Sequence, residues 1–221
     1  MDIVENLKKI KGELGKEVDL VAVSKTKPKE DLQAAYDAGQ RIFGENRPQE
    51  MQSKAEALPK DIEWHMVGHL QSNKVKYIAP FVSMIHSIDK LSTLKEINKR
   101  ARQNDRVIEV LLQMHIAEEE SKFGMNEEKL KAFLESEKLK NFENIRIVGM
   151  MGMATFTDDQ EKVKKEFDTL KQIFDLTKAT YFADDVNFKV LSMGMSGDYK
   201  TAIEAGSNMV RIGSQIFGAR N

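Results

Sequence analysis

A lysine near the N-terminus has the type and position needed for covalent chemistry. Lys25 directly follows the apolar run 20–24, which has the composition of a buried strand. An apolar environment disfavours the charged ammonium, so a lysine there can lose its proton and attack a carbonyl as a neutral amine. The alternative is that the strand ends one residue earlier and that Lys25 is a solvated residue at its edge.

Two pairs of glycine and serine late in the chain could bind an anion. Ser196 and Gly197 lie between an apolar run and the expected helix 199–205, and Gly213 and Ser214 follow another apolar run. Backbone N–H groups at the start of a helix attract negative charge. The alternative is that both glycines only permit tight turns and that Ser196 only caps the helix.

Arg211 lies in an apolar run and therefore needs a partner inside the protein. One alternative is a carboxylate in the core, such as Glu45 or Glu109. The other is that the guanidinium is directed at a hydrogen-bond acceptor of a ligand.

Asn46 and His65 are polar residues in or directly after further strand candidates. His65 and His69 are four residues apart, which would suit a metal on a helix, but in a strand this spacing separates them by roughly 13 Å. We therefore expect a histidine that contacts a ligand at the mouth of the site, and no metal site.

The composition sets limits on the class of protein. The chain has 221 residues, 41% hydrophobic and 31% charged residues, a net charge of −1 and no cysteine. Disulfides and thiolate chemistry are excluded, and no charge excess indicates nucleic acid or membrane binding. The N-terminal segment resembles an amphipathic helix and not a signal peptide, so we expect a cytoplasmic protein. We expect a monomer, because no separate oligomerisation element is visible.

Eight strand candidates alternate with helical patterns, which favours a single (β/α)8 TIM barrel over residues 1–221. An open doubly wound sheet competes, but no Gly-x-Gly-x-x-Gly follows the first strand. In a barrel, the two glycine–serine pairs fall in the loops after strands 7 and 8, where phosphate sites often lie. The expected strands are 20–24, 41–44, 63–68, 84–88, 107–115, 146–151, 188–192 and 209–212.

Taken together, these segments resemble the YggS/PROSC family of pyridoxal phosphate homeostasis proteins. The resemblance covers the chain from end to end and keeps the order of the motifs. They are Val-Ala-Val-Ser-Lys25-Thr, Phe43-Gly-Glu-Asn46, Trp64-His65-Met-Val-Gly-His-Leu-Gln71, Phe123-Gly124-Met, Leu191-Ser-Met-Gly-Met-Ser196 and Val210-Arg211-Ile-Gly213-Ser.

The resemblance implies a barrel similar to the N-terminal domain of alanine racemase. It also implies pyridoxal 5′-phosphate (PLP) held as a Schiff base on Lys25. The phosphate is expected at Ser196 and at the pair Gly213 and Ser214, and Arg211 is expected near the pyridine nitrogen. Asn46 and His65 are expected to line the cofactor pocket.

The leading hypothesis is a non-catalytic protein that stores, buffers or delivers PLP, with PLP-dependent apoenzymes as recipients. An arginine at the pyridine nitrogen disfavours its protonation and makes the ring a poorer electron sink. Racemases of this type use a tyrosine from a second domain, whereas none of the four tyrosines here lies at an expected strand end. A weak amino-acid racemase is the second hypothesis, and a Schiff-base aldolase without a bound cofactor is the third.

Overall fold

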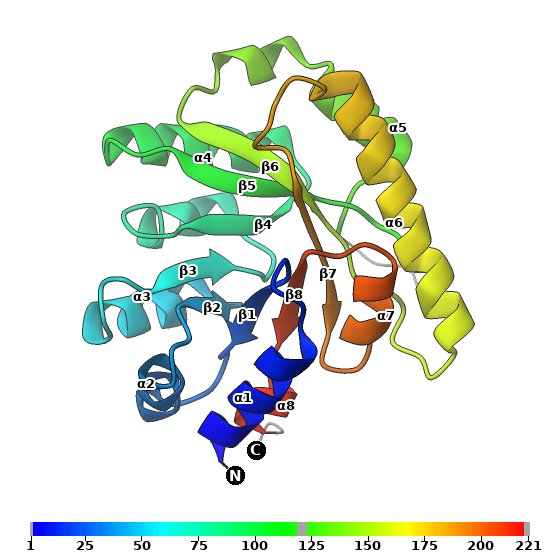
Figure 1. The fold of residues 1–221 in the computed structure, drawn as a ribbon. Coiled ribbons are helices and arrows are strands. Elements are labelled where there is room, and N and C mark those ends of the chain that lie inside the picture. Colours follow the sequence, from blue (N-terminus) through cyan, green and yellow to red (C-terminus); the bar gives the residue numbers. More distant parts are fainter. Residues whose placement is uncertain (1, 119–122, 219–221) are drawn as a thin grey trace.

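The computed structural model describes residues 2–118 and 123–218, and in this part of the chain eight parallel strands alternate with helices (Figure 1). Each strand pairs with the next one, and β8 pairs with β1 to close the sheet. The expected (β/α)8 barrel is therefore confirmed. The strands are β1 (Asp19–Val23), β2 (Ile42–Glu45), β3 (Glu63–Met66), β4 (Met84–Ile88), β5 (Ile108–Gln113), β6 (Ile145–Met151), β7 (Val190–Met195) and β8 (Met209–Ile212).

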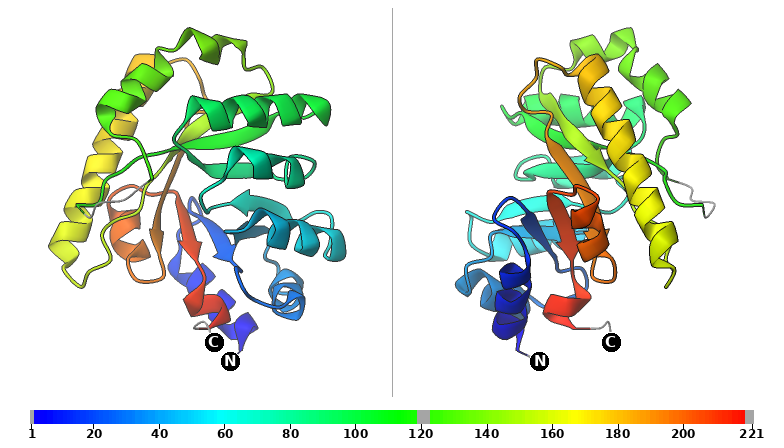
Figure 2. Two further views of the ribbon diagram at one scale, coloured as in Figure 1. Left: turned by 180° about the vertical axis from the view of Figure 1, so that it is seen from behind. Right: turned by 45° about the vertical axis from the view of Figure 1, so that its right-hand side comes forward.

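Helices surround the barrel and cover its outer face (Figure 2). Within the described residues, none of them has the length and apolar character that a membrane crossing requires. The α-helices are α1 (Ile3–Glu13), α2 (Lys29–Asp37), α3 (Pro48–Ala57), α4 (Leu91–Gln103), α5 (Glu127–Leu134), α6 (Gln160–Tyr181), α7 (Tyr199–Glu204) and α8 (Ser214–Phe217), and the 3-10 helices are η1 (Ser72–Tyr77) and η2 (Glu137–Asn141).

The alternation of side chains along each strand divides the buried residues into two sets. Outward-facing residues, such as Val210 and Ile212 of β8, join the large core between the sheet and the helices. Inward-facing residues, such as Met209, form a smaller apolar cluster inside the barrel. Arg211 lies between Val210 and Ile212, so its side chain is directed into the barrel.

β7 differs from the expected strand in its position along the chain. It begins at Val190 and ends at Met195, whereas the sequence pattern indicated 188–192. Phe188 packs outside the strand between Phe174 and Phe182, with ring centroids 5.1 Å and 4.3 Å away. The later start places Ser192 in the middle of β7 instead of at its end.

Candidate functional site

A cavity of about 590 Å³ opens at the carboxyl-terminal ends of the barrel strands, the end of the fold where ligand sites of such barrels lie. Segments that are far apart in the sequence meet there, because closure of the barrel brings β8 next to β1. Six of the seven expected site residues line this cavity: Lys25, Asn46, Ser196, Arg211, Gly213 and Ser214.

Lys25 lies in the turn that follows β1, and its side chain is half-buried. The strand ends at Val23, so the lysine is neither a strand residue nor a fully solvated one. The next residue, Thr26, has a φ of +65°, a left-handed conformation that is unusual for a β-branched residue. Its backbone N–H donates a hydrogen bond to Glu50 Oε1 at 2.7 Å.

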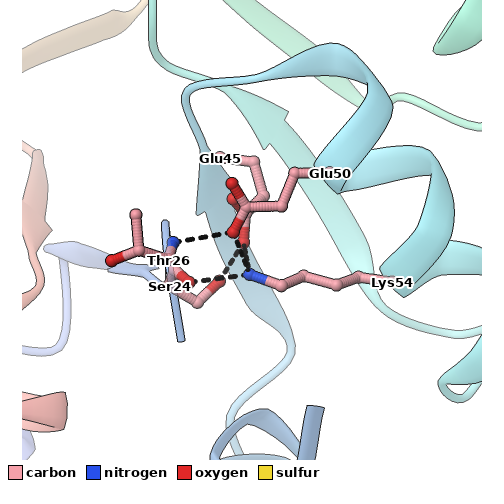
Figure 3. A network of polar contacts seen from close by, with 5 residues as sticks. All are labelled: Ser24, Thr26, Glu45, Glu50 and Lys54. Atoms are coloured by element: carbon pink, nitrogen blue, oxygen red, sulfur yellow. Dashed lines mark hydrogen bonds and ion pairs between the residues drawn. The ribbon is translucent and has the colours of Figure 1, made fainter. Parts of the chain in front are cut away.

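A buried network of charged side chains supports this turn (Figure 3). Lys54 is 4% exposed, and its Nζ donates to Ser24 O at 2.8 Å, Glu45 Oε1 at 2.7 Å and Glu50 Oε1 at 2.8 Å. Ser24 Oγ also donates to Glu45 Oε1, at 2.7 Å. Burial raises the pKa of Glu45, and the charge of Lys54 opposes this rise. We call Glu45, Glu50 and Lys54 the charged triad.

The loops after β7 and β8 are joined to one another at the cavity wall. The backbone N–H of Gly213 donates to Ser196 Oγ at 3.4 Å, and Gln215 Nε2 donates to Ser196 O at 2.6 Å. A Cβ on residue 213 would lie 2.8 Å from Val23 O, so only glycine allows this close approach of the β8 loop to β1. Serine hydroxyls and backbone N–H groups therefore gather on the same wall of the cavity as Lys25.

Arg211 is fully buried at the base of the cavity, and burial lowers its pKa to about 10. Its Nη1 donates to Ser192 Oγ at 2.6 Å, and its Nη2 donates to Gly152 O at 3.0 Å. The alternative that Arg211 pairs with Glu45 or Glu109 is wrong, and the carboxylate whose charge acts on the guanidinium is that of Asp198. Glu45 instead pairs with Lys54, and Glu109 is a half-exposed residue 3.9 Å from Arg146.

His65 occupies a different place from the one expected, because it is 2% exposed and lies outside the set of residues that line the cavity. Its Nδ1 lies 3.0 Å from His86 Nε2, and His86 Nδ1 lies 3.1 Å from Ser192 Oγ. Burial lowers the pKa of His65 to about 3 and that of His86 well below its ordinary value. We call the hydrogen-bonded series of side chains His65, His86 and Ser192 the neutral chain. Its last member, Ser192, contacts Arg211.

The side chains around the cavity suit a ligand that carries an anionic group and a carbonyl. Lys25 offers an amine, Arg211 a cation, and the β7 and β8 loops offer hydroxyl and N–H groups. Asn46 Oδ1 is buried without a hydrogen-bond partner within the described residues, which leaves an acceptor at the cavity wall for a donor of the ligand. His69 does not join His65, because it stacks on Phe123 with ring centroids 4.1 Å apart.

The sequence analysis did not predict the charged triad or the neutral chain, although one residue of each stands out in the sequence. Lys54 lies on the apolar face of α3, in register with Met51, Ala55 and Leu58, so a lysine on this face requires buried partners. His86 interrupts the apolar strand β4. The amphipathic pattern of α3 therefore indicates that Lys54 is buried, and the apolar pattern of β4 indicates that His86 is buried. Neither pattern identifies the hydrogen-bond partners of these residues.

Several known proteins are similar to this chain. Residues 2–221 match the family described as alanine racemase, N-terminal domain. The pyridoxal phosphate homeostasis protein of Aquifex aeolicus is 40% identical over 202 residues, 91% of this chain and 86% of that protein. The one from Vibrio alginolyticus is 40% identical over 215 residues, 95% of this chain and 90% of that protein. PipY of Synechococcus elongatus is 31% identical and covers 98% of this chain and 100% of its own, with TM-scores of 0.90 without PLP and 0.87 with PLP bound.

Proposed function

The chain belongs to the pyridoxal phosphate homeostasis proteins of the alanine racemase N-terminal domain family, and from this premise we propose that it holds PLP as a Schiff base on Lys25. We further propose that it stores, buffers or delivers the cofactor, with PLP-dependent apoenzymes as recipients and a monomer as the working unit. One observation carries the proposal: a lysine and two loops with hydroxyl and N–H donors line the same cavity.

The proposed covalent step needs a neutral amine on Lys25 and the aldehyde that PLP supplies. Lys25 Nζ attacks the aldehyde carbon, a C=N bond replaces the C=O bond, and the aldehyde oxygen leaves with the two amine hydrogens as water. The attack requires the neutral form of this amine, because an ammonium has no lone pair to donate. No other reactant is needed, and the step reverses when the cofactor is released.

The remaining residues of the cavity would hold the cofactor at its other groups. Ser196, Gly213 and Ser214 would bind the phosphate, and Asn46 would accept a hydrogen bond from a donor on the ring. The guanidinium of Arg211 would face the pyridine nitrogen and disfavour its protonation by like-charge repulsion. His65 would act indirectly, because the neutral chain ends at Arg211.

We propose storage without turnover, for two reasons. An unprotonated ring is a poor electron sink for carbanion chemistry. In addition, the described residues that line the cavity include no tyrosine, and Tyr199 donates its hydroxyl proton to Glu13 at 2.5 Å outside it. A racemase would incorporate solvent deuterium at the α-carbon of an amino acid, and we expect none. Incorporation at a rate that depends on Lys25 would contradict storage without turnover.

The Lys25→Ala variant tests the Schiff base directly. We expect the purified wild-type protein to absorb visible light with PLP and, after borohydride reduction, to carry a pyridoxyl group on the peptide that contains Lys25. The Lys25→Ala variant should lose this adduct while its thermal unfolding stays close to that of the wild type, because the side chain is not part of the core.

Lys29→Ala is the matched control, because Lys29 begins α2 close by in the sequence and does not line the cavity. It should keep the full adduct. A pyridoxyl group that maps to Lys27, or a Lys25→Ala variant that keeps one adduct per chain, would show that the assignment of the lysine is wrong.

A further inference from the structure

We propose that Glu50, in the charged triad, is a positioning residue that holds the turn 24–26 in the conformation that directs Lys25 into the cavity. This inference rests on the proposed Schiff base. It concerns α3, an element that lies outside the barrel sheet and contributes no residue to the cavity wall.

The charged triad binds both peptide units that flank Lys25. Lys54 Nζ donates to the carbonyl of Ser24, which belongs to the peptide unit before Lys25. Glu50 Oε1 accepts from the N–H of Thr26, which belongs to the peptide unit after it. The backbone of Lys25 is therefore fixed on both sides, and its side chain starts from a defined position.

The conformation of the turn explains why such support is needed. Thr26 is a β-branched residue with a φ of +65°, and a residue of this type avoids the left-handed region unless its surroundings impose it. The hydrogen bond from its N–H to Glu50 is charge-assisted and 2.7 Å long. Without this acceptor, we expect the turn to relax and to move the amine of Lys25 away from the cavity.

The triad also keeps Glu50 itself in place. Glu50 Oε1 accepts from Lys54 Nζ as well as from Thr26, and its side chain is 22% exposed. Lys54 uses its three donors on Ser24, Glu45 and Glu50, so its orientation is fully determined. The position of the turn therefore depends on a helix whose sequence gives no direct indication of a role at the cavity.

Three substitutions of Glu50 separate the hydrogen bond from the charge. Glu50→Gln keeps an acceptor for the N–H of Thr26, Glu50→Asp keeps the charge but withdraws the acceptor, and Glu50→Ala removes both. Glu56→Ala is the control, because Glu56 is an exposed acid on the same helix. Two ligands are compared: PLP, and pyridoxine 5′-phosphate, whose alcohol cannot form a Schiff base.

We expect Glu50→Ala and Glu50→Asp to weaken Schiff-base formation with PLP by about tenfold, or about 1.4 kcal/mol, measured from the visible absorbance. Glu50→Gln and Glu56→Ala should stay within about twofold of the wild type, and pyridoxine 5′-phosphate should bind all variants within about twofold. If Glu50→Ala fails to fold, the contrast between the more conservative variants Glu50→Asp and Glu50→Gln still decides the question.

Three results would overturn the inference: wild-type Schiff-base formation in both Glu50→Ala and Glu50→Asp, a loss in Glu50→Gln as large as in Glu50→Asp, or a parallel loss of pyridoxine 5′-phosphate binding. The last result would show that Glu50 maintains the whole cavity instead of the lysine. A wild-type protein that forms no Schiff base would instead contradict the proposed function, so the two failures can be told apart.

Discussion

Lys25 and Arg211 lie on opposite sides of the β1–β8 seam. The groups that hold the turn of Lys25 are charged, whereas the hydrogen-bond partners of Arg211 are neutral. The turn of Lys25 is held by the charged triad, in which one buried ammonium lies between two carboxylates. Arg211 is held by the hydroxyl of Ser192, the carbonyl of Gly152 and, through Ser192, two neutral imidazoles. Lys25 and Arg211 line the cavity, whereas the residues of the charged triad and of the neutral chain do not.

This difference agrees with the roles that we propose for the two side chains. The guanidinium of Arg211 keeps its charge, because burial lowers its pKa only to about 10 and the charge of Asp198 opposes this fall. Its hydrogen-bond partners Ser192 and Gly152 are neutral. The proposed Schiff base requires the neutral amine of Lys25. The acids of the triad hold Lys54 and the N–H of Thr26, and Lys54 holds the carbonyl of Ser24.

The largest effect that we expect is a loss in the free energy of unfolding of the protein when the charged triad is broken. Lys54→Met removes the ammonium of the triad and leaves the buried carboxylate of Glu45 without its ion-pair partner. Breaking a buried ion pair in this way costs about 3–5 kcal/mol. We expect a loss of this size in the free energy of unfolding, measured by urea denaturation.

Lys164→Met is the control for this loss, because Lys164 pairs with Asp168 at 2.7 Å on the surface of α6. Exposed pairs contribute about 0–1 kcal/mol, so this variant should unfold almost as the wild type does. Equal losses in the two variants would mean that the charges of the triad are not coupled by burial.

A smaller effect is expected on the neutral side of the comparison. Ser192→Ala removes the acceptor of Arg211 Nη1 and the partner of His86 Nδ1, and an unsatisfied buried group costs about 1–3 kcal/mol. Ser87→Ala is the control, because Ser87 Oγ is buried without a partner within the described residues. We expect the Ser87 variant to lose less stability than the Ser192 variant in urea, and the reverse order would contradict the role of the neutral chain.

The fold could be predicted from the sequence because each strand is a short apolar run between helical patterns. Closure of the barrel then brought Lys25 and the pairs at Ser196 and Gly213 to one cavity, as the topology requires. Strand ends were less accurate. Phe188 has the character of a strand residue, but its ring packs with two other phenylalanines outside the sheet.

The partners of buried polar residues could not be predicted, because they depend on contacts between distant segments. The partner of Arg211 is a serine 19 residues earlier, and the partner of His65 is a histidine 21 residues later. An acid was one of the two partners that we considered for a buried arginine, with Glu45 and Glu109 as examples. Neither of these acids reaches Arg211, because Glu109 lies near the start of β5 beside Arg146 and Glu45 pairs with Lys54.

The two supports should also respond to pH in opposite directions. Burial lowers the pKa of His65 from 6.5 to about 3, so between these values the unfolded chain binds the additional proton. The free energy of unfolding therefore falls as the pH falls through this window. Burial raises the pKa of Glu45 above 4.5, so in the range above 4.5 the folded state binds this proton more strongly than the unfolded chain does. The contribution of Glu45 to the free energy of unfolding therefore falls as the pH rises through this range.

One histidine contributes a slope of at most about 1.4 kcal/mol per pH unit. We expect His65→Gln to have a shallower loss of stability than the wild type as the pH falls from 6.5 towards 3, measured by urea denaturation at each pH. His115→Gln is the control, because His115 is half-buried and lies outside the neutral chain. If His65→Gln keeps the wild-type slope, His65 is not held neutral by burial. That result would contradict the description of the groups behind Arg211 as neutral.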